Sequence, residues 1–335
     1  MQPSTNSVSR RQWLTQAAAA TAALSLSPRL FAQAPWPGKP VKIIVPFVPG
    51  GATDTVARML GEKLSASLGQ PMVIDNRGGA GGILGTDAVA KAAPDGYTFV
   101  LSLSTSLLIN QFLYDKLPYN PQRDLALVSQ IAVAPVTLAV HPSVPAKNAG
   151  ELMRYIKAQR GKLSYGSWGQ GSYAHLAGAY MSRQQDAEMS HVPYKGEAPM
   201  LLDLLGGQIQ IAFASALGSK QHADAGKLRL IGVTGEQRMG VLPEVPTLME
   251  QGLRDDAFRI VGWFGLAAPA KTPTDIVQRM SKEVSVACAL PDVRARIMAM
   301  GFMPVAGTPD AFAAVYKQDM PGWEALDKVS GAKLD

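Results

Sequence analysis

The sequence of 335 residues contains only one cysteine and four histidines, and both scarcities restrict the chemistry available to the chain. A single cysteine, Cys288, cannot form a disulfide within the chain. It lies in the apolar stretch 276–290, which has helical character, so we predict a buried structural thiol. None of the histidines is spaced for metal binding with another histidine, a cysteine or an acid. We therefore expect neither a metal nor another cofactor.

Charge is also in short supply, because charged residues make up only 17% of the sequence while hydrophobic residues make up 47%. This composition is typical of a globular protein with an ample core, and the length suits two domains of about 150 residues each. The basic residues are scattered along the chain, so we expect no nucleic-acid partner. After the first 34 residues, no apolar run is long enough to span a membrane.

The N-terminal segment has the features of an export signal. Arg10 and Arg11 form a twin-arginine pattern, and the stretch 17–26 that follows is uncharged and rich in alanine and leucine. A small-x-small site at 32–34 completes the order that a signal peptide requires. We predict that residues 1–34 are removed after export by the Tat route, which places the protein in the periplasm. A disordered N-terminus or a membrane anchor is the alternative.

The order of segments in the first third of the chain predicts a parallel α/β unit. The run at 41–47, apolar except for Lys42 and rich in β-branched residues, is typical of a strand buried on both faces. It is followed by a helical pattern at 55–68, a strand at 72–75, a helix at 83–93 and a strand at 97–103. This βαβαβ order implies a sheet with helices on its faces.

A second unit of the same plan begins near residue 139. Its expected strands are 163–166, 188–192, 209–214 and 228–233, and its expected helices are 151–159, 173–183 and 197–205. A strand at 260–267 returns to the first unit, and helices at 275–290, 291–300 and 309–326 close the chain. We therefore predict that domain 1 comprises residues 35–138 and 262–335, and that domain 2 comprises residues 139–261.

Both units place glycine-rich turns between a strand and the start of a helix, at 50–51, 79–82 and 169–171. A helix N-terminus offers unpaired N–H groups to an anion, and glycine lets the backbone approach that anion closely. In open α/β sheets, ligands bind beside the carboxyl ends of the strands, where such turns lie. Two facing domains of this kind would hold an anion in a cleft that closes by a hinge motion. Turns without ligand contact are the structural alternative.

Motifs for nucleotide binding and hydrolysis fit less well. The sequence has no G-x-x-x-x-G-K-[ST] pattern, and the glycines at 79–85 are wrongly spaced for G-x-G-x-x-G. The segment 165–169 places Ser167 in a turn but lacks the first glycine of G-x-S-x-G. A secreted hydrolase that uses Ser167 and His175 is an alternative, although packing or capping is the favoured role of His175. We predict that the protein is not an enzyme.

Eight motifs in consecutive order resemble the Bug family, the TctC-like receptors of tripartite tricarboxylate transporters. The first is Pro46-Phe47-Val48-Pro49-Gly50-Gly51-x-x-Asp54, and the longest runs from Tyr165-Gly166-Ser167 through Gly178. The others lie at 75–82, 93–98, 191–196, 203–207, 242–247 and 263–269. The resemblance extends from about residue 36 to residue 328.

The resemblance implies an α/β fold of the two-domain periplasmic-binding-protein type, a type II-like Venus flytrap. Each domain would contain a mostly parallel sheet flanked by helices, with the ligand in the cleft between the domains. The implied function is a solute-binding protein that captures a small carboxylate for the membrane subunits of a tripartite tricarboxylate-type transporter. A sensor that presents the carboxylate to a signalling partner is the alternative. We expect a monomer.

Matching positions imply which residues contact the ligand, mainly through backbone groups and hydroxyls. They are Phe47, Gly50, Gly51 and Asp54 in the first loop, Gly79, Ala80 and Gly81 in the second, Ser104, Thr105 and Asn110 in the third, and Ser167, Gly171, Ser172 and His175 in the fourth, with Tyr194 and Lys195 near the cleft rim and Ser215 after the strand at 209–214. For Asp54 a helix cap is the alternative role, and for Lys195 a solvated charge.

One departure from the family pattern concerns the ligand. Ala214 and Ser215 follow Phe213, where family members often have an aspartate. An acid at this place can pair with a ligand amine. Its absence leads to the hypothesis that the ligand is an amine-free acid, either a dicarboxylate or an aromatic acid.

Overall fold

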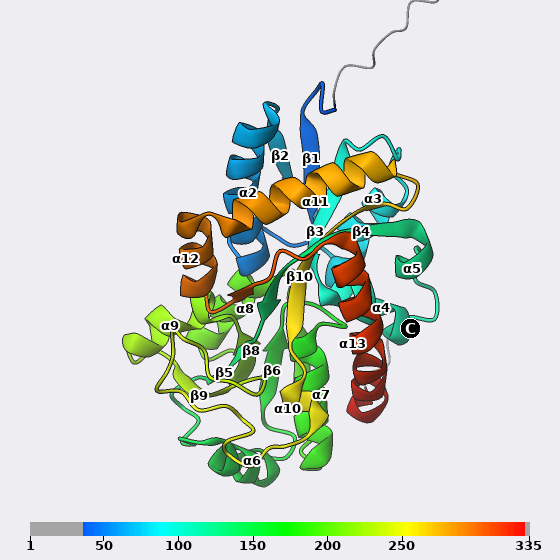
Figure 1. Ribbon diagram of the computed structural model, residues 1–335. Coiled ribbons are helices and arrows are strands. Elements are labelled where there is room, and N and C mark those ends of the chain that lie inside the picture. The colour runs from blue at the N-terminus through cyan, green and yellow to red at the C-terminus, as the bar shows by residue number, and fades with distance from the viewer. Residues whose placement is uncertain (1–35, 332–335) are drawn as a thin grey trace, which may run out of the picture. The chain divides into compact units, whose positions relative to one another are not determined.

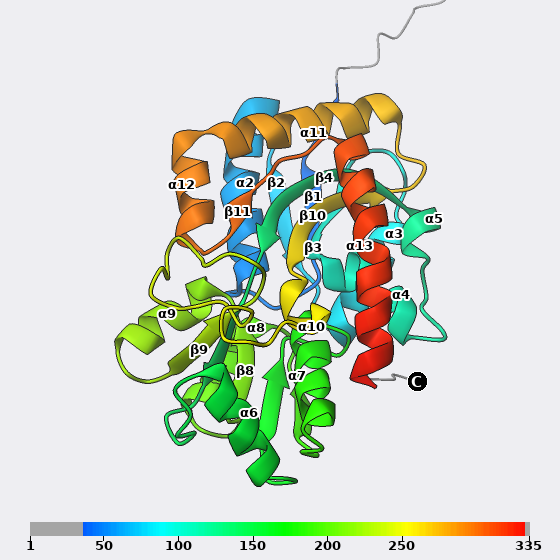
Figure 2. The same ribbon diagram turned by 60° about the horizontal axis from the view of Figure 1, so that its bottom comes forward.

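The computed structural model describes residues 36–331, so the predicted signal peptide lies outside the described residues. The chain divides into a short segment, 1–38, and a compact unit that begins at Lys39. This unit contains two β-sheets, each covered by helices (Figures 1 and 2). We call the six-stranded sheet and its helices lobe 1, and the five-stranded sheet and its helices lobe 2.

The sheet of lobe 1 has the strand order β11-β4-β10-β3-β1-β2. Its strands are β1 (Val41–Val45), β2 (Met72–Asn76), β3 (Thr98–Leu103), β4 (Leu125–Ala134), β10 (Gly262–Pro269) and β11 (Met303–Pro304). β1 pairs in parallel with β2 and β3, and β10 runs antiparallel to β3 and β4. Ile43 and Ile44 are both buried although they point to opposite faces. β1 is therefore covered on both sides, as its apolar run predicts.

The sheet of lobe 2 has the order β7-β6-β8-β5-β9. Its strands are β5 (Thr137–Val140), β6 (Ser164–Ser167), β7 (Ser190–Pro193), β8 (Ile211–Ala214) and β9 (Arg229–Val233). β6 is parallel to β7 and β8, whereas β5 is antiparallel to β8 and β9. The two βα units of this lobe thus follow the sequence prediction.

Both sheets are mixed, which refines the prediction of mostly parallel sheets. The antiparallel pairs involve β4, β5 and β10, which lead the chain into and out of lobe 2. A strand that enters a sheet without a βαβ crossover need not run parallel to its neighbours. The chain passes to lobe 2 between Ala134 and Thr137 and returns between Val233 and Gly262. We propose that the domains divide at these two crossings, close to the predicted boundaries.

Helices cover both sheets. Those of lobe 1 are α2 (Ala52–Leu68), α3 (Ile83–Ala90), α4 (Asn110–Leu113), α5 (Pro121–Asp124), α11 (Thr274–Ala289), α12 (Pro291–Ala299) and α13 (Pro309–Ser330), together with the short turns η1 (Ala80–Gly82) and η2 (Thr105–Ile109). Those of lobe 2 are α6 (Ala149–Ala158), α7 (Tyr173–Gln184), α8 (Glu197–Leu205) and α9 (Ala216–Asp224), and α10 (Asp256–Arg259) lies on the return crossing. No helix of residues 36–331 is long and apolar enough to cross a membrane.

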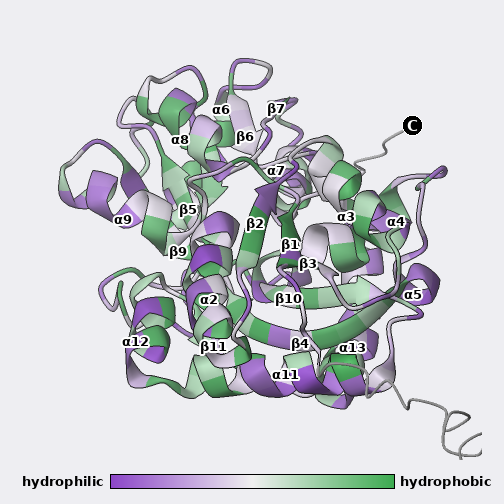
Figure 3. Cartoon of the chain, turned by 90° about the horizontal axis from the view of Figure 1, so that it is seen from above, coloured by the Kyte–Doolittle hydropathy of each residue, from purple (hydrophilic) through white to green (hydrophobic). Residues whose placement is uncertain are grey.

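Helix α11 shows how the helices pack on the sheets. Val277, Met280 and Val284 are buried along one side of the helix, and its polar side faces outward in the view of Figure 3. This spacing places one stripe of the helix on the core. Cys288 lies on the same stripe with 2% of its surface exposed, and burial raises the pKa of its thiol to about 12. The predicted buried thiol is thereby confirmed.

Helix α13 contacts both lobes. It packs against β4 of lobe 1 and against α7 of lobe 2, and Figures 1 and 2 show it running beside both. Trp323, which is fully buried, meets the ring of Tyr173 edge to face at 6.0 Å between ring centroids. The last helix of the chain therefore touches a side chain at the start of α7.

Candidate functional site

A cavity of about 690 Å³, measured out to its opening, lies between the lobes. Lobe 1 lines it with Phe47, Val48 and residues 51–54 and 103–105, and lobe 2 with Trp168, Tyr173, Glu197 and Ser215. The two crossings contribute Ala134, Val136, Thr234 and Gly262, and Phe264 and Phe302 complete the wall. The lining combines aromatic rings with hydroxyl, carboxyl and backbone groups, which is the mixture typical of a small-molecule site.

Six of the predicted ligand residues line this cavity, namely Phe47, Gly51, Asp54, Ser104, Thr105 and Ser215. The loop from β1 into α2 brings the first three there, with Gly51 as the N-cap residue of α2 and Asp54 in its first turn. Ser104 and Thr105 follow the carboxyl end of β3, where an α/β fold is expected to present ligand groups. The lining thus combines a helix start with hydroxyl groups.

Asp54 holds the first loop in shape. Its Oδ2 accepts hydrogen bonds from the backbone N–H of Gly50 at 3.1 Å and from Nε of Arg58 at 3.0 Å, and its Oδ1 accepts one from Asn76 at 3.0 Å. Burial opposes ionisation, but these bonds outweigh it and lower the pKa of Asp54. Asp54 is the third residue of α2 and not its N-cap, so it secures the turn from inside the helix.

Glu197, the first residue of α8, reaches the cavity although the family pattern does not point to it. Its Oε1 accepts the backbone N–H of Ser215 at 2.5 Å, and its Oε2 accepts that of Ala52 at 3.4 Å. Burial raises the pKa of Glu197 in spite of these two bonds. An acid therefore lies beside Ser215, supplied by α8 instead of by the strand that ends at Ala214.

Trp168 is a second lining residue that sequence reasoning missed. Its side chain is 8% exposed, and its indole N–H has no hydrogen-bond acceptor among residues 36–331. A buried donor without an acceptor costs roughly 1–3 kcal/mol. Trp168 is an unspecified position within the motif at 165–178, and Glu197 directly follows the motif at 191–196. Their nearness to the motifs is the signal that could have found them.

The second glycine loop meets the fourth loop instead of lining the cavity. A Cβ on Gly81 would lie 2.1 Å from the carbonyl oxygen of Gln170, and one on Gly169 would lie 3.0 Å from the Cα of Gly81. Asn110 donates from Nδ2 to the carbonyl of Gly81 at 3.1 Å, and a Cβ on Gly171 would approach its Oδ1 within 2.6 Å. The backbones of the two lobes therefore touch here. Of the predicted residues, Gly81, Asn110 and Gly171 form this contact, and Gly79 and Ala80 precede Gly81 in the same loop.

The serine and histidines of the fourth loop bond to one another. Ser172 is the N-cap of α7 and accepts the backbone N–H of His175 at 3.3 Å. Nδ1 of His175 accepts the N–H of Gly171 at 3.2 Å, and its ring stacks on His191 at 3.8 Å. Oγ of Ser167 lies 2.7 Å from Nε2 of His191. Burial lowers the pKa of His175 to about 4 and, with the charge of His175, that of His191 to about 3. Such weak bases activate a serine poorly.

The remaining predicted residues lie at the rim of the contact between the lobes. The hydroxyl of Tyr194 donates to Asp203 at 2.6 Å, within lobe 2. Lys195 is exposed, and its carbonyl accepts the backbone N–H of Val48 at 3.3 Å. Lys195 therefore joins the lobes through its backbone, and its side-chain charge is solvated.

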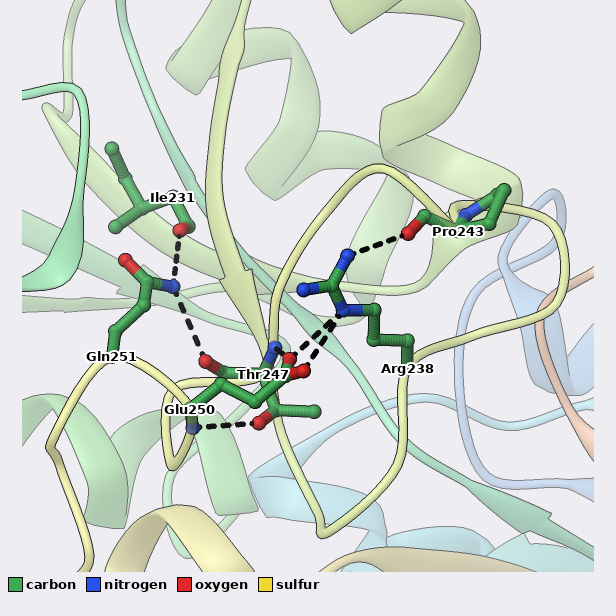
Figure 4. Close-up of polar contacts among 6 residues, drawn as sticks. All are labelled: Ile231, Arg238, Pro243, Thr247, Glu250 and Gln251. Carbon is green, nitrogen blue, oxygen red and sulfur yellow. Dashed lines mark hydrogen bonds and ion pairs between the residues drawn. The ribbon is translucent and has the colours of Figure 1, made fainter.

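A second groove lies beside the crossings, between residues 234–241 and the segment of α12 and β11. Figure 4 shows the network that holds its loop. Arg238 bonds Glu250 at 2.9 Å and the carbonyl of Pro243 at 2.9 Å, while Thr247 and Glu250 bond each other reciprocally. This reciprocal pair has the pattern of a capping box.

Among residues 36–331, no cluster of three histidines, cysteines or acids is suited to a metal.

Three solved structures resemble this chain over nearly its whole length. The periplasmic binding protein BugD is 33% identical, with a TM-score of 0.83, and the match covers 89% of this chain and 99% of BugD. An R. palustris protein solved with adipate is 33% identical, with a TM-score of 0.84 over 88% and 98% of the two chains. MatC from Rhodopseudomonas palustris with bound malate is 32% identical, with a TM-score of 0.82 over 87% and 99%.

The two-domain fold predicted from the sequence is therefore confirmed, because these neighbours are binding proteins of that architecture. The family model of the tripartite tricarboxylate transporter family receptor matches residues 56–330. That match spans both lobes and both crossings. The chain thus belongs to the tripartite tricarboxylate transporter receptor family, the TctC-like group of periplasmic solute-binding proteins to which Bug proteins belong.

Proposed function

We propose that the protein captures a small carboxylate in the cavity between its lobes and delivers it to the membrane subunits of a tripartite tricarboxylate-type transporter. The observation that carries this proposal is the cavity between the lobes, in which the start of α2 meets the hydroxyls of Ser104 and Thr105. These groups are hydrogen-bond donors suited to an anion.

The donors suffice to hold a carboxylate without an arginine. No lysine, arginine or histidine lines the cavity in the described part of the chain. A hydrogen bond to a charged group contributes roughly 1.5–3 kcal/mol, and a micromolar complex needs about 8 kcal/mol. Several such bonds are therefore needed, before the cost of ordering the groups is subtracted. The backbone N–H groups of α2, the two hydroxyls and the indole N–H of Trp168 can provide them.

The lining and the neighbours support two ligand classes. Adipate and malate in two similar structures support a dicarboxylate. The rings of Phe47, Phe264 and Phe302 support an aromatic acid as the other choice. The hypothesis of an amine-free ligand rested on the missing acid after Phe213, and Glu197 now supplies an acid beside Ser215. An ionised Glu197 favours a ligand ammonium, so binding of an amine-free acid requires that the charge of Glu197 be neutralised.

Thermal unfolding against a panel of acids tests the proposal. The panel contains adipate, malate, citrate, benzoate, aspartate and glutamate. A ligand at 100 times its dissociation constant adds about 2.7 kcal/mol to the free energy of unfolding, which raises Tm by several degrees. A rise with one class of acid supports the receptor and identifies that class. If no acid on the panel raises Tm, and none is extracted from the purified protein, the proposed function is wrong.

A further inference from the structure

Glu197 belongs to lobe 2, yet its carboxylate bonds to both lobes. One oxygen accepts the N–H of Ser215, the N-cap residue of α9, and the other accepts the N–H of Ala52, the first residue of α2. These are the kinds of groups that a helix start offers to an anion. Glu197 therefore takes up, with its own carboxylate, part of the site proposed for the ligand carboxylate.

The charge within the cavity is one-sided. Asp54 and Glu197 are the two acids among its lining residues, and no cation of residues 36–331 accompanies them in that lining. Asp54 is paired with Arg58, which lies outside the cavity. Glu197 has two neutral N–H donors instead of a cationic partner within the described residues. The two acids thus differ in how well their negative charge is compensated.

The charged groups on the elements around Glu197 are engaged elsewhere or exposed. Near the start of α2, Arg58 bonds Asp54 and Asn76. On α8, Asp203 accepts from Tyr194, and on α9, Lys220 pairs with Asp224. Two further groups are Lys195, which is exposed, and His222, which lies in the last turn of α9. A ligand carboxylate at the start of α2 therefore meets Glu197 without a cation between them.

Building on the proposed function, we propose that Glu197 makes binding proton-linked, so that the cleft takes up an amine-free carboxylate together with one proton. The proton comes from water and goes to the carboxylate of Glu197. Two carboxylates that share a buried site cannot both remain ionised without a large cost, and one proton relieves it. The raised pKa of Glu197 before ligand arrives makes it the acceptor, whereas Asp54 stays ionised.

Isothermal titration calorimetry of the purified protein with adipate, malate and benzoate measures this linkage. Titrations in phosphate and in Tris buffer, between about pH 6.5 and 9, separate the heat of binding from the heat of proton exchange. We expect an uptake that approaches one proton per bound acid. Affinity should fall by up to about tenfold per pH unit where the uptake is largest.

Glu197→Gln removes the titrating group while it keeps the shape of the side chain. Its proton uptake should be near zero, its affinity independent of pH, and its affinity at about pH 9 at least tenfold tighter than that of the wild type. Glu151→Gln is the matched control, because Glu151 also accepts a backbone N–H at a helix start, that of Lys147 at 2.7 Å, and does not line the cavity. It should behave like the wild type.

The proposal is overturned if the wild type binds one of the three acids without proton uptake, or if Glu197→Gln takes up as many protons. Should that variant not fold, the wild-type titrations alone still decide the first point. Binding of aspartate but of none of the three acids, weakened in Glu197→Gln or Glu197→Asp, would show an ammonium partner for Glu197. That result would leave the receptor function intact. Binding of no acid at all would overturn the proposed function as well.

Discussion

At the scale of single residues, Asp54 and Glu197 show how one cavity gives two carboxyl groups opposite properties. Three bonds, one from a guanidinium, lower the pKa of Asp54, whereas burial with two backbone donors leaves the pKa of Glu197 raised. The difference is the cationic partner. Asp54 therefore maintains the loop across the physiological pH range, and Glu197 is the group that responds to pH.

The stacked histidines predict a loss of stability in acid. Burial lowers the pKa of His175 to about 4 and that of His191 to about 3, below the ordinary value of about 6.5. The unfolded chain then binds more protons than the folded one, so the free energy of unfolding is retained above about pH 6.5. It falls toward pH 3 by up to roughly 1.4 kcal/mol per pH unit for each histidine.

Urea unfolding between about pH 4.5 and 7.5 measures this slope. His191→Gln, which retains a partner for Ser167, should reduce the slope by about half, because one of the two depressed histidines is gone. His222→Gln is the control, since His222 lies outside this pair on α9. An unchanged slope in His191→Gln would contradict the assignment.

Trp168→Phe should weaken acid binding by about tenfold, the equivalent of one hydrogen bond of roughly 1.4 kcal/mol. The free energy of unfolding should not fall by a comparable amount, because the indole N–H has no acceptor among residues 36–331. Trp323→Phe is the control, since its indole N–H is likewise buried and unpaired in the described chain but does not line the cavity. Equal affinities of both variants in calorimetry would remove Trp168 from the site.

Sequence patterns reached part of the cavity lining and missed the rest for a physical reason. Phe47, Gly51 and Ser104 follow the ends of β1 and β3, and the chain order of strand and helix is enough to place them. Glu197 and Trp168 reach the cavity only through the way in which lobe 2 faces lobe 1. No periodicity or spacing within one segment contains that information.

At the scale of the elements, the helix starts divide into two kinds. α7 has its own cap, because Ser172 accepts the N–H of His175. α2 begins at Gly51, whose residue type offers no side-chain oxygen, and the N–H of Ala52 is taken by Glu197 from the other lobe. The cap of α7 comes from its own N-terminal residue and serves the fold. At the start of α2, a ligand carboxylate could replace Glu197 as the acceptor of the N–H.

Ser172→Ala should therefore lower stability more than affinity. Loss of an N-cap hydroxyl costs about 1 kcal/mol, and Ser172 is fully buried outside the cavity lining. Thermal unfolding and calorimetry on the same preparation separate the two effects. Ser172→Thr, which keeps the hydroxyl, is the control. A large loss of affinity at unchanged Tm would restore Ser172 to the ligand site predicted from the sequence.

The strands and helices of the βα units could be located from the sequence because each is bounded by glycine or proline turns and has one clear period. The expected helix 197–205 coincides with α8, and the helix expected at 173–183 is α7. The sequence patterns do not predict the strands β4 and β5, because their partners β10 and β8 are distant in the chain. Pairing across such distances has no local sequence signature.

At the scale of the whole molecule, two of the contacts between the lobes are made by backbone groups. One is the contact of Gly81 with Gly169 and Gln170, and the other is the bond from Val48 to Lys195. Both contacts are made by backbone groups, which leaves little room for a side chain. Closure of the lobes at the first contact therefore depends on glycine at positions 81 and 169.

Gly81→Ala should weaken acid binding by at least tenfold, because the new Cβ would lie 2.1 Å from the carbonyl oxygen of Gln170 and hold the lobes apart. Gly161→Ala is the control for backbone strain: its φ of +69° resembles the +59° of Gly81, but its Cβ meets open space. Both variants should lose about 1 kcal/mol of stability. Calorimetry measures the affinity of both variants, and small-angle scattering detects an opened form. Equal affinities of the two variants would contradict the prediction.

The two crossings also determine the order in which the protein can be completed during synthesis. All strands of lobe 2 lie in one continuous stretch, from Thr137 to Val233, whereas β10 occupies a central place in the sheet of lobe 1 between β3 and β4. The ribosome therefore delivers every part of lobe 2 before lobe 1 can close its sheet. β1 to β4 must wait, with the edge of β3 unpaired, until Gly262–Pro269 emerges. A nascent chain of this protein thus has a late-closing core, and unpaired strand edges of that kind are where chaperones are needed.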